Sequence, residues 1–186
     1  MTPIEAPTLR DGDVVVRPLG DGDVGAIVQA CRDPEIPRWT RVPQPYTRED
    51  ARQFLAVAAT EAASGAGIAL AIADARERLI GTIGLMEVDT AAGRAEIGYW
   101  LAREARGTGA ATRAVRLVCD WAVRELGLLR LEILAHTDNV PSGRVAERAG
   151  FRRTGEIRSL PRMPRERQDG YAVHVWPPPP GKGGPA

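Results

Sequence analysis

Cysteine and histidine are scarce in this chain of 186 residues. The two cysteines, Cys31 and Cys119, lie far apart in segments of helical pattern and form no Cys-x-x-Cys spacing, which excludes a disulfide framework. The two histidines, His136 and His174, lack a second close ligand of the kinds that zinc prefers. We therefore expect no metal site.

Long apolar runs are also missing. No stretch approaches the roughly 18–20 residues that span a bilayer, and residues 1–13 have neither the basic patch nor the apolar core of a signal peptide. The sequence therefore predicts a cytoplasmic protein with no membrane partner.

Charge of one sign is not in excess. The 25 basic and 24 acidic residues leave a net charge of +1, so no overall field favours nucleic acid, and we expect no nucleic-acid partner. Locally, seven arginines and two glutamates lie between Arg148 and Arg167, a surplus of 7 − 2 = +5. This segment is either a solvated surface or a patch for phosphate or an acidic partner, and the former is the commoner case.

The composition is that of a globular protein, with 44% hydrophobic and 26% charged residues. The length suits one domain, which we place at residues 1–176. The last ten residues, 177–186, are rich in proline and glycine and are expected to be a disordered tail.

Hydrophobic patterns predict strands and helices in alternation after an initial meander. The expected strands are 13–17, 68–73, 79–88, 95–101, 129–135, a piece from 151 and 171–176. The expected helices are 21–31, 47–64, 111–126 and 140–149. Residues 36–46, with three prolines, and residues 153–167, with two, are expected to be irregular loops. This order predicts a mixed α/β sheet of about seven strands, mostly antiparallel and flanked by helices, rather than a doubly wound sheet.

A glycine-rich turn joins the expected strand 95–101 to the helix that follows. Gly107 and Gly109 let backbone N–H groups turn outward, and the helix presents its positive end to the same place. Such a turn is either an anion cradle or a plain connection. It lacks the Gly-Lys-Ser/Thr of a P-loop and the Gly-x-Gly-x-x-Gly of dinucleotide folds.

Two motifs in this part of the chain resemble those of the GNAT N-acetyltransferase superfamily. The turn, RGTGAA, matches the Gln/Arg-x-x-Gly-x-Gly/Ala pyrophosphate loop of that family. Downstream, Asn139-x-x-Ser142-x-x-Val145-x-Glu147-x-x-Gly150-Phe151 resembles its later motif. The resemblance covers residues 14–175, and the IGYW sequence before the turn is most similar to the RimJ/RimL branch, which acetylates protein N-termini.

The resemblance implies that acetyl-CoA is the co-substrate and lies where the sheet splays, between the fourth and fifth expected strands. The pyrophosphate would rest on the turn, and the pantetheine arm would pair with the strand before it, as an added strand does. Arg106 is either a phosphate contact or a solvated residue. The implied cofactor-binding residues are Trp100, Leu101, Ala102, Arg106, Gly107, Thr108, Gly109, Ala110, Ala111, Asn139 and Ser142.

The chain departs from the family at the general acid. Many members carry a tyrosine seven residues after the motif's asparagine, where this chain has Ala146. Ser142 is the candidate replacement, although a serine in the first turn of a helix is often a cap. Glu96 is the candidate general base acting through water, or else simply a charge at a strand edge.

The acceptor is an amine of a protein N-terminus or a small molecule. Deprotonating a lysine side chain, with pKa about 10.4, costs roughly 4–5 kcal/mol at pH 7, whereas an α-amine near 7.7–8.0 costs only about 1 kcal/mol. A weak base is therefore enough for an N-terminus. Trp39 and Tyr46, on the proline-rich loop, are expected to border the acceptor together with residues 158–167, or else to be hydrophobic anchors of their loop. The resemblance adds a possible homodimer. The alternative is a catalytically silent module that binds acyl-CoA.

Overall fold

The computed structural model describes residues 2–177, which include one eight-stranded mixed sheet. The strand order is β1-β2-β3-β4-β5-β6-β8-β7. The bounds are β1 Leu9–Asp11, β2 Val14–Pro18, β3 Ile68–Ala73, β4 Leu79–Asp89, β5 Arg94–Leu101, β6 Arg130–His136, β7 Arg152–Arg158 and β8 Tyr171–Trp176. The predicted α/β class is confirmed. The additional strand is β1, whose three residues are too short to show a period-two pattern.

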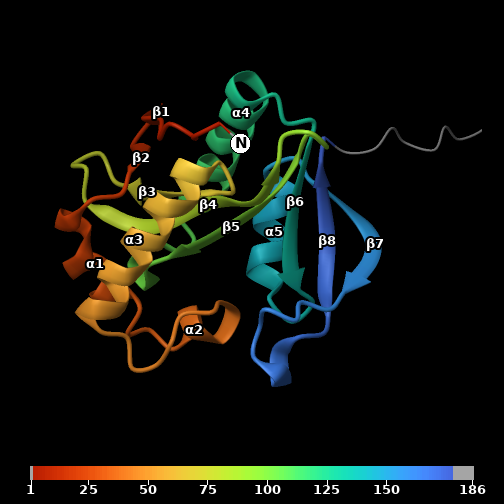
Figure 1. Cartoon of the computed structure of the whole chain (residues 1–186). Coiled ribbons are helices and arrows are strands. Elements are labelled where there is room, and N and C mark those ends of the chain that lie inside the picture. Colours follow the sequence, from red (N-terminus) through yellow and green to blue (C-terminus); the bar gives the residue numbers. More distant parts are fainter. Residues whose placement is uncertain (1, 178–186) are drawn as a thin grey trace, which may run out of the picture.

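Within the described residues, five α-helices flank the sheet (Figure 1): α1 Val24–Ala30, α2 Glu35–Trp39, α3 Arg48–Ser64, α4 Ala110–Leu126 and α5 Val140–Arg148. Short 3₁₀ turns lie at Asp21–Asp23, Arg103–Ala105 and Arg165–Arg167. The expected tail lies almost wholly outside the described residues.

A capping box starts α3, whose helical pattern the sequence predicted over residues 47–64. The backbone N–H of Asp50 donates to Oγ1 of Thr47 at 3.2 Å, and the backbone N–H of Thr47 donates to Oδ2 of Asp50 at 2.7 Å. The helix ends at Gly65, whose φ of 75° is the left-handed conformation that suits glycine. Local sequence therefore fixes both ends of this helix.

The expectation that residues 36–46 are all loop is wrong, because α2 occupies Glu35–Trp39. Pro34 is its N-cap and Pro37 is its third residue. The first N–H groups of a helix have no partner within the helix, so a proline there removes no hydrogen bond. The backbone N–H of Thr40 still donates to the carbonyl of Ile36 at 3.0 Å.

The expectation that residues 153–167 are irregular is also wrong in its first part. Strand β7 runs to Arg158 and pairs with β8, with a register shift between Arg153 and Ile157. Most of β7 is exposed, and its arginines give no apolar alternation, so the sequence pattern indicated only its start, as the extended piece from 151. The β7–β8 loop, residues 159–170, contains the two prolines.

Each face of the sheet has its own apolar cluster. Ile97 of β5 packs in a cluster with Val115 and Val118 of α4, whereas Trp100 packs with Ile27 of α1 in the other. Neighbouring strand residues point to opposite faces, so β5 contributes to both. Helices α4 and α5 therefore cover one face, and α1 to α3 lie on the other (Figure 1).

The sheet opens between β5 and β6. These strands are parallel and pair only over Arg94–Glu96 and Arg130–Glu132, whereas β5 pairs with β4 as far as Leu101. Beyond Glu96 the two strands diverge into a V (Figure 1), which confirms the predicted splay. One edge of β5 is thus left without a strand partner along its second half.

Candidate active site

The glycine-rich turn leads from β5 to the first residue of α4. Gly107 and Gly109 have φ values of 77° and 84°, and Gly109 is the N-cap. A Cβ at either position would meet nothing within 4 Å, so the turn has open space beside it. The 17-residue α4 directs its free N–H groups and positive end to the same place. The turn therefore fits a phosphate group.

Arg106 is engaged by other residues of the chain in this structure. Its guanidinium donates to the carbonyl oxygen of Leu101, from Nε at 3.2 Å and from Nη2 at 3.0 Å. Nη1 lies 2.8 Å from Oδ2 of Asp33. The side chain thus clamps the turn to the end of β5. The Leu101 carbonyl, one of the groups expected to pair with the pantetheine arm, is already engaged.

Thr108 braces the turn from within. Its Oγ1 donates to the carbonyl oxygen of Ala105 at 2.8 Å, and Ala110 and Ala111 are buried behind it. The backbone N–H groups, rather than these side chains, are left to meet a ligand.

Asn139 is the N-cap of α5. Its Oδ1 accepts a hydrogen bond from the backbone N–H of Ser142 at 3.3 Å. The side-chain amide nitrogen takes no part in the cap, so the predicted contact with pantetheine would use that group.

Ser142 is therefore not the residue that caps α5. Its hydroxyl lies 2.9 Å from the hydroxyl of Tyr99 on β5, and the Tyr99 hydroxyl also donates to the carbonyl oxygen of Ser142 at 3.2 Å. Burial raises the pKa of Tyr99 to about 12, so the phenol stays protonated near neutral pH. Sequence reasoning did not single out Tyr99, although it lies within the IGYW segment.

Glu96 is a buried carboxylate at the point where the strands part. It is 9% exposed and lies opposite Glu132 in the last parallel pair. Nη2 of Arg162 pairs with its Oε1, and Nη1 of Arg162 donates to Oε1 of Glu87 at 3.1 Å. Burial raises the pKa of Glu96, although Arg162 opposes the shift. The glutamate is therefore not a simple charge at a strand edge.

The two aromatic residues predicted beside the acceptor have different surroundings. The Trp39 ring lies 5.5 Å from the ring of His136 at the end of β6, and His136 lies 5.4 Å from Tyr171. Trp39 therefore adjoins the open end of the V. Tyr46 is half-buried against the α1 to α3 cluster, where burial raises its pKa to about 12. Tyr46 thus serves as a hydrophobic anchor, an alternative that the sequence left open.

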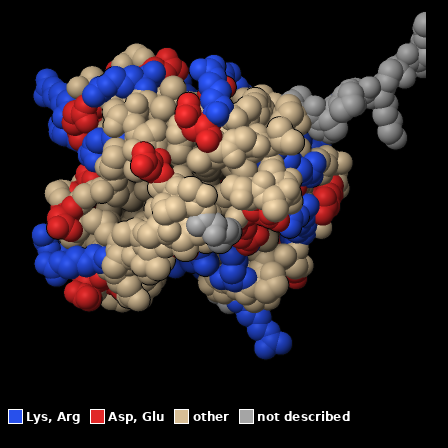
Figure 2. Space-filling view, turned by 45° about the horizontal axis from the view of Figure 1, so that its top comes forward, with Lys and Arg blue, Asp and Glu red and all other residues tan. Residues whose placement is uncertain are grey.

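Several arginines of the basic segment bind within the chain. Nη1 of Arg158 donates to Oε2 of Glu132 at 2.6 Å, and Arg162 pairs with two glutamates as described above. Arg167 donates to the carbonyl oxygens of Pro37 and Arg38. Figure 2 shows basic and acidic side chains interspersed on one face of the molecule, without a continuous basic patch.

Two further searches cover the described part of the chain only. Residues 2–177 contain no group of three His, Cys, Asp or Glu side chains that could hold a metal ion. Among the helices of these residues, none is long and apolar enough to cross a bilayer.

Comparison with known proteins identifies the family. Residues 13–152 match the family model of the GNAT acetyltransferase domain. The uncharacterised N-acetyltransferase p20 of Bacillus licheniformis is 28% identical over 171 residues, which are 91% of this chain and 93% of that protein.

Solved structures share the fold. RimJ of Mycobacterium smegmatis in complex with CoA-disulfide has a TM-score of 0.79 and 21% identity, covering 91% of this chain and 85% of that one. Spermidine N-acetyltransferase of Vibrio cholerae in complex with CoA and spermine has a TM-score of 0.73 and 19% identity, covering 89% and 95%. The chain therefore belongs to the GNAT family of acetyltransferases, which transfer an acetyl group to amines.

Proposed function

We propose that this enzyme transfers the acetyl group of acetyl-CoA to a primary amine by direct attack, where β5 and β6 diverge. The observation that carries the proposal is the arrangement of groups around this point. The glycine-rich turn and the Tyr99–Ser142 pair belong to the face covered by α4 and α5, whereas Glu96 shares the opposite face with Trp100. Two substrates can therefore approach the gap from opposite sides.

The face covered by α4 and α5 suits acetyl-CoA. The backbone N–H groups of the turn and the end of α4 would bind the pyrophosphate, because they offer donors and positive potential without a Cβ in the way. The unpaired edge of β5 would bind the pantetheine arm. The RimJ relative with bound CoA-disulfide supports this choice of co-substrate.

Glu96 would accept the proton of the acceptor through a water molecule. Burial shifts the pKa of Glu96 upwards, towards neutral pH, and a general base is most effective when its pKa lies near the pH of the reaction. In the structure Arg162, on the β7–β8 loop, forms an ion pair with Glu96. This ion pair has to break before the Glu96 carboxylate can contact the water next to the acceptor. The neutral amine would then attack the acetyl carbon, forming the C–N bond.

Ser142 would supply the proton for the sulfur as the C–S bond breaks, with Tyr99 orienting its hydroxyl. The nitrogen loses its extra proton to water as the amide forms, and the serine regains one from water. The thiol of CoA is a fair leaving group, since free thiols have a pKa near 8.5, so this assistance is modest. Ala146, where many relatives carry the acid tyrosine, is fully buried. The Tyr99–Ser142 pair takes over that role in this chain.

A protein N-terminus is the favoured acceptor, because deprotonating an α-amine at pH 7 costs only about 1 kcal/mol and a single buried carboxylate suffices. A small polyamine is the other acceptor class, as in the spermidine N-acetyltransferase relative. The buried alanine at position 146 also favours one alternative function, a silent module that binds acyl-CoA.

Thiol release from acetyl-CoA in the presence of peptides and small amines tests the proposal. Release that depends on one amine class, with matching acetylated product, supports transfer and identifies the acceptor. Tight CoA binding in calorimetry without release on any amine would instead support the silent module.

A further inference from the structure

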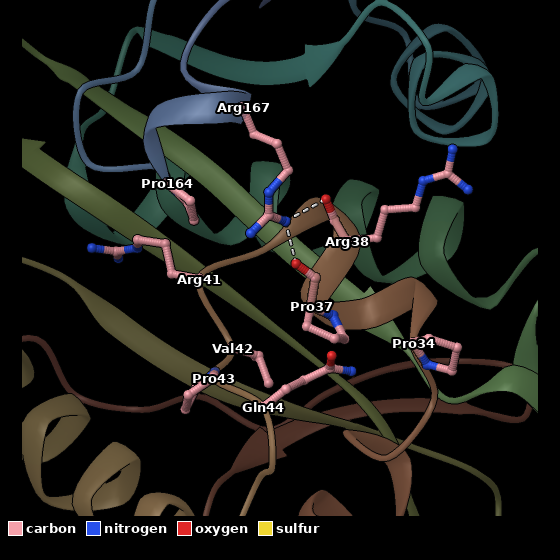
Figure 3. A pocket seen from close by; sticks show the side chains of 9 residues that line it. All are labelled: Pro34, Pro37, Arg38, Arg41, Val42, Pro43, Gln44, Pro164 and Arg167. Atoms are coloured by element: carbon pink, nitrogen blue, oxygen red, sulfur yellow. Dashed lines mark hydrogen bonds between the residues drawn. The ribbon is translucent and has the colours of Figure 1, made fainter.

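A pocket of about 540 Å³ lies between the segment that contains α2 and the β7–β8 loop (Figure 3). Three arginines line it: Arg38, Arg41 and Arg167. The other six lining residues are uncharged, and four of them are prolines. None of the nine described lining residues is acidic, so the wall of the pocket is basic.

The positive charge of this pocket is poorly compensated. Arg41 forms no ion pair with any residue whose side chain the structure describes. Arg38 lies 3.1 Å from Glu35, but both side chains are about half exposed, and such pairs contribute little. Arg167 donates from Nη1 to two neutral carbonyl groups, which hold the guanidinium in place but leave its charge and its other N–H groups available.

The three guanidinium groups do not converge on one point. In Figure 3, Arg167 reaches towards α2, while the side chains of Arg38 and Arg41 extend to opposite sides of it. A single small anion cannot contact all three, whereas an extended chain with several carboxylates can. The prolines restrict the backbone of the wall, which lowers the ordering cost of binding.

The pocket adjoins the open end of the V. The Arg38 guanidinium lies 4.7 Å above the Trp39 ring, and Trp39 contacts His136 at the end of β6. The same loop that supplies Arg167 also supplies Arg162, the partner of Glu96. An acceptor with its amine at Glu96 can therefore continue along the loop to the arginines.

We propose that the acceptor is a polypeptide N-terminus followed within a few residues by acidic residues, which this pocket binds. This inference rests on the acetyl transfer proposed above and names its substrate class. It also gives Arg167 of the β7–β8 loop a role in substrate specificity. Arg158 and Arg162, by contrast, form ion pairs with glutamates of the chain.

The test compares three peptides of equal length that begin with Ser-Ala and continue with Asp-Glu-Asp, Asn-Gln-Asn or Lys-Arg-Lys. We expect kcat/KM for the acidic peptide to exceed that for the neutral one by about 10-fold, mostly through KM, as one charge-assisted hydrogen bond provides. The preference should shrink as salt rises. Equal rates, or a preference for the basic peptide, would overturn the inference.

Paired variants locate the effect. In Arg38→Gln/Arg41→Gln the ratio of acidic to neutral kcat/KM should fall most of the way towards one, because Arg167 alone of the three arginines remains. The control, Arg52→Gln/Arg124→Gln, removes two exposed arginines from α3 and α4 and should keep the wild-type ratio. A preference that survives in the first variant, or disappears equally in the control, would show that the pocket is not the cause.

Binding without turnover separates this inference from the proposed function. The fluorescence anisotropy of each peptide, labelled at its C-terminus, is measured with CoA present. Tighter binding of the acidic peptide that is lost in Arg38→Gln/Arg41→Gln supports the pocket even if no peptide is acetylated. Equal binding of acidic and neutral peptides contradicts it. Acetylation of a small amine with one carboxylate as readily as the acidic peptide would contradict the polypeptide class.

Discussion

The hydroxyl of Tyr99 lies 2.9 Å from the hydroxyl of Ser142, and the two residues come from opposite sides of the gap in the sheet. Tyr99 is on β5, whereas Ser142 is on α5, which packs on β6, β7 and β8. The hydrogen bond therefore links the two halves of the sheet where β5 and β6 no longer pair. Because the phenol stays neutral, it can orient the serine throughout the physiological pH range.

Ser142→Ala should lower kcat by about 10-fold to 100-fold, the usual loss for a modest proton donor. The melting temperature should change little, because Asn139 rather than Ser142 caps α5. Initial rates at saturating acetyl-CoA and a thermal melt check both parts. Full turnover with an earlier melt would make Ser142 a structural residue only.

Tyr99→Phe removes the hydroxyl that orients Ser142 and leaves the ring in place. We expect kcat to fall by about 3-fold to 10-fold, the net contribution of one hydrogen bond. In the Ser142→Ala background the same change should have no further effect on kcat, because the two hydroxyls act as one unit. Additive losses in the double variant would show that Tyr99 acts independently of Ser142.

Glu96→Gln should reduce turnover in a limited pH range. Burial raises the pKa of Glu96, so below that pKa the wild-type carboxyl is protonated and does not act as a base. Above the pKa of the acceptor the amine is already neutral. The loss should therefore be largest between these two values and shrink on either side. Overlapping pH–rate profiles would show that Glu96 is structural.

The control for this variant is Glu87→Gln. It removes the exposed partner of Arg162 and keeps Glu96. We expect its pH–rate profile to retain the wild-type shape. The same loss of turnover in both variants would assign the effect to the position of Arg162 instead of to a base.

Gly109→Glu should abolish CoA binding, because a carboxylate beside the turn repels the pyrophosphate. The substitution also strains the backbone, since a side chain at φ of 84° costs about 1–2 kcal/mol. Gly109→Ala carries the same strain without the charge and should keep most of the affinity. Calorimetry measures the affinity of both folded variants for acetyl-CoA and so separates the effect of the charge from that of the strain. Equal affinity in the two would contradict the placement of the pyrophosphate.

Arg106→Lys distinguishes a clamp from a phosphate contact. Lysine keeps the charge but cannot reproduce the paired bonds to the Leu101 carbonyl and the contact with Asp33. We expect a lower melting temperature and about 10-fold weaker CoA binding, because the turn loses its support. A variant with wild-type stability and affinity would mean that the charge alone matters.

The sequence predicted most of the fold because its signals were local. The Thr47–Asp50 capping box, the glycine turn and the apolar periods of β3 to β6 lie within short windows, where propensity and pattern suffice. Helix α2 and the continuation of strand β7 beyond its first residues were missed for the opposite reason. The prolines of α2 are tolerated because they lie at the N-cap and in the first turn of the helix. The arginines of β7 are tolerated because this strand lies at the exposed edge of the sheet.

The candidate site was predictable only in part. The sequence indicated the phosphate turn, Glu96 and Ser142, because each lies in or beside a motif. It did not indicate that Tyr99 meets Ser142, residues 43 positions apart, or that Arg162 reaches Glu96, 66 positions apart. Such contacts depend on how β5, α5 and the β7–β8 loop pack, which no local pattern encodes. The clamp formed by Arg106 was missed for the same reason.

The most direct test of the central claim is the mass of the amine after incubation with isotope-labelled acetyl-CoA. Wild-type protein should give one labelled acetyl group on the amine for each CoA thiol released, and Gly109→Glu should give none. Labelled product at the same rate in that variant would contradict the site. Tight binding of acetyl-CoA by the wild type, with no labelled amine from any peptide or small amine, would contradict acetyl transfer itself.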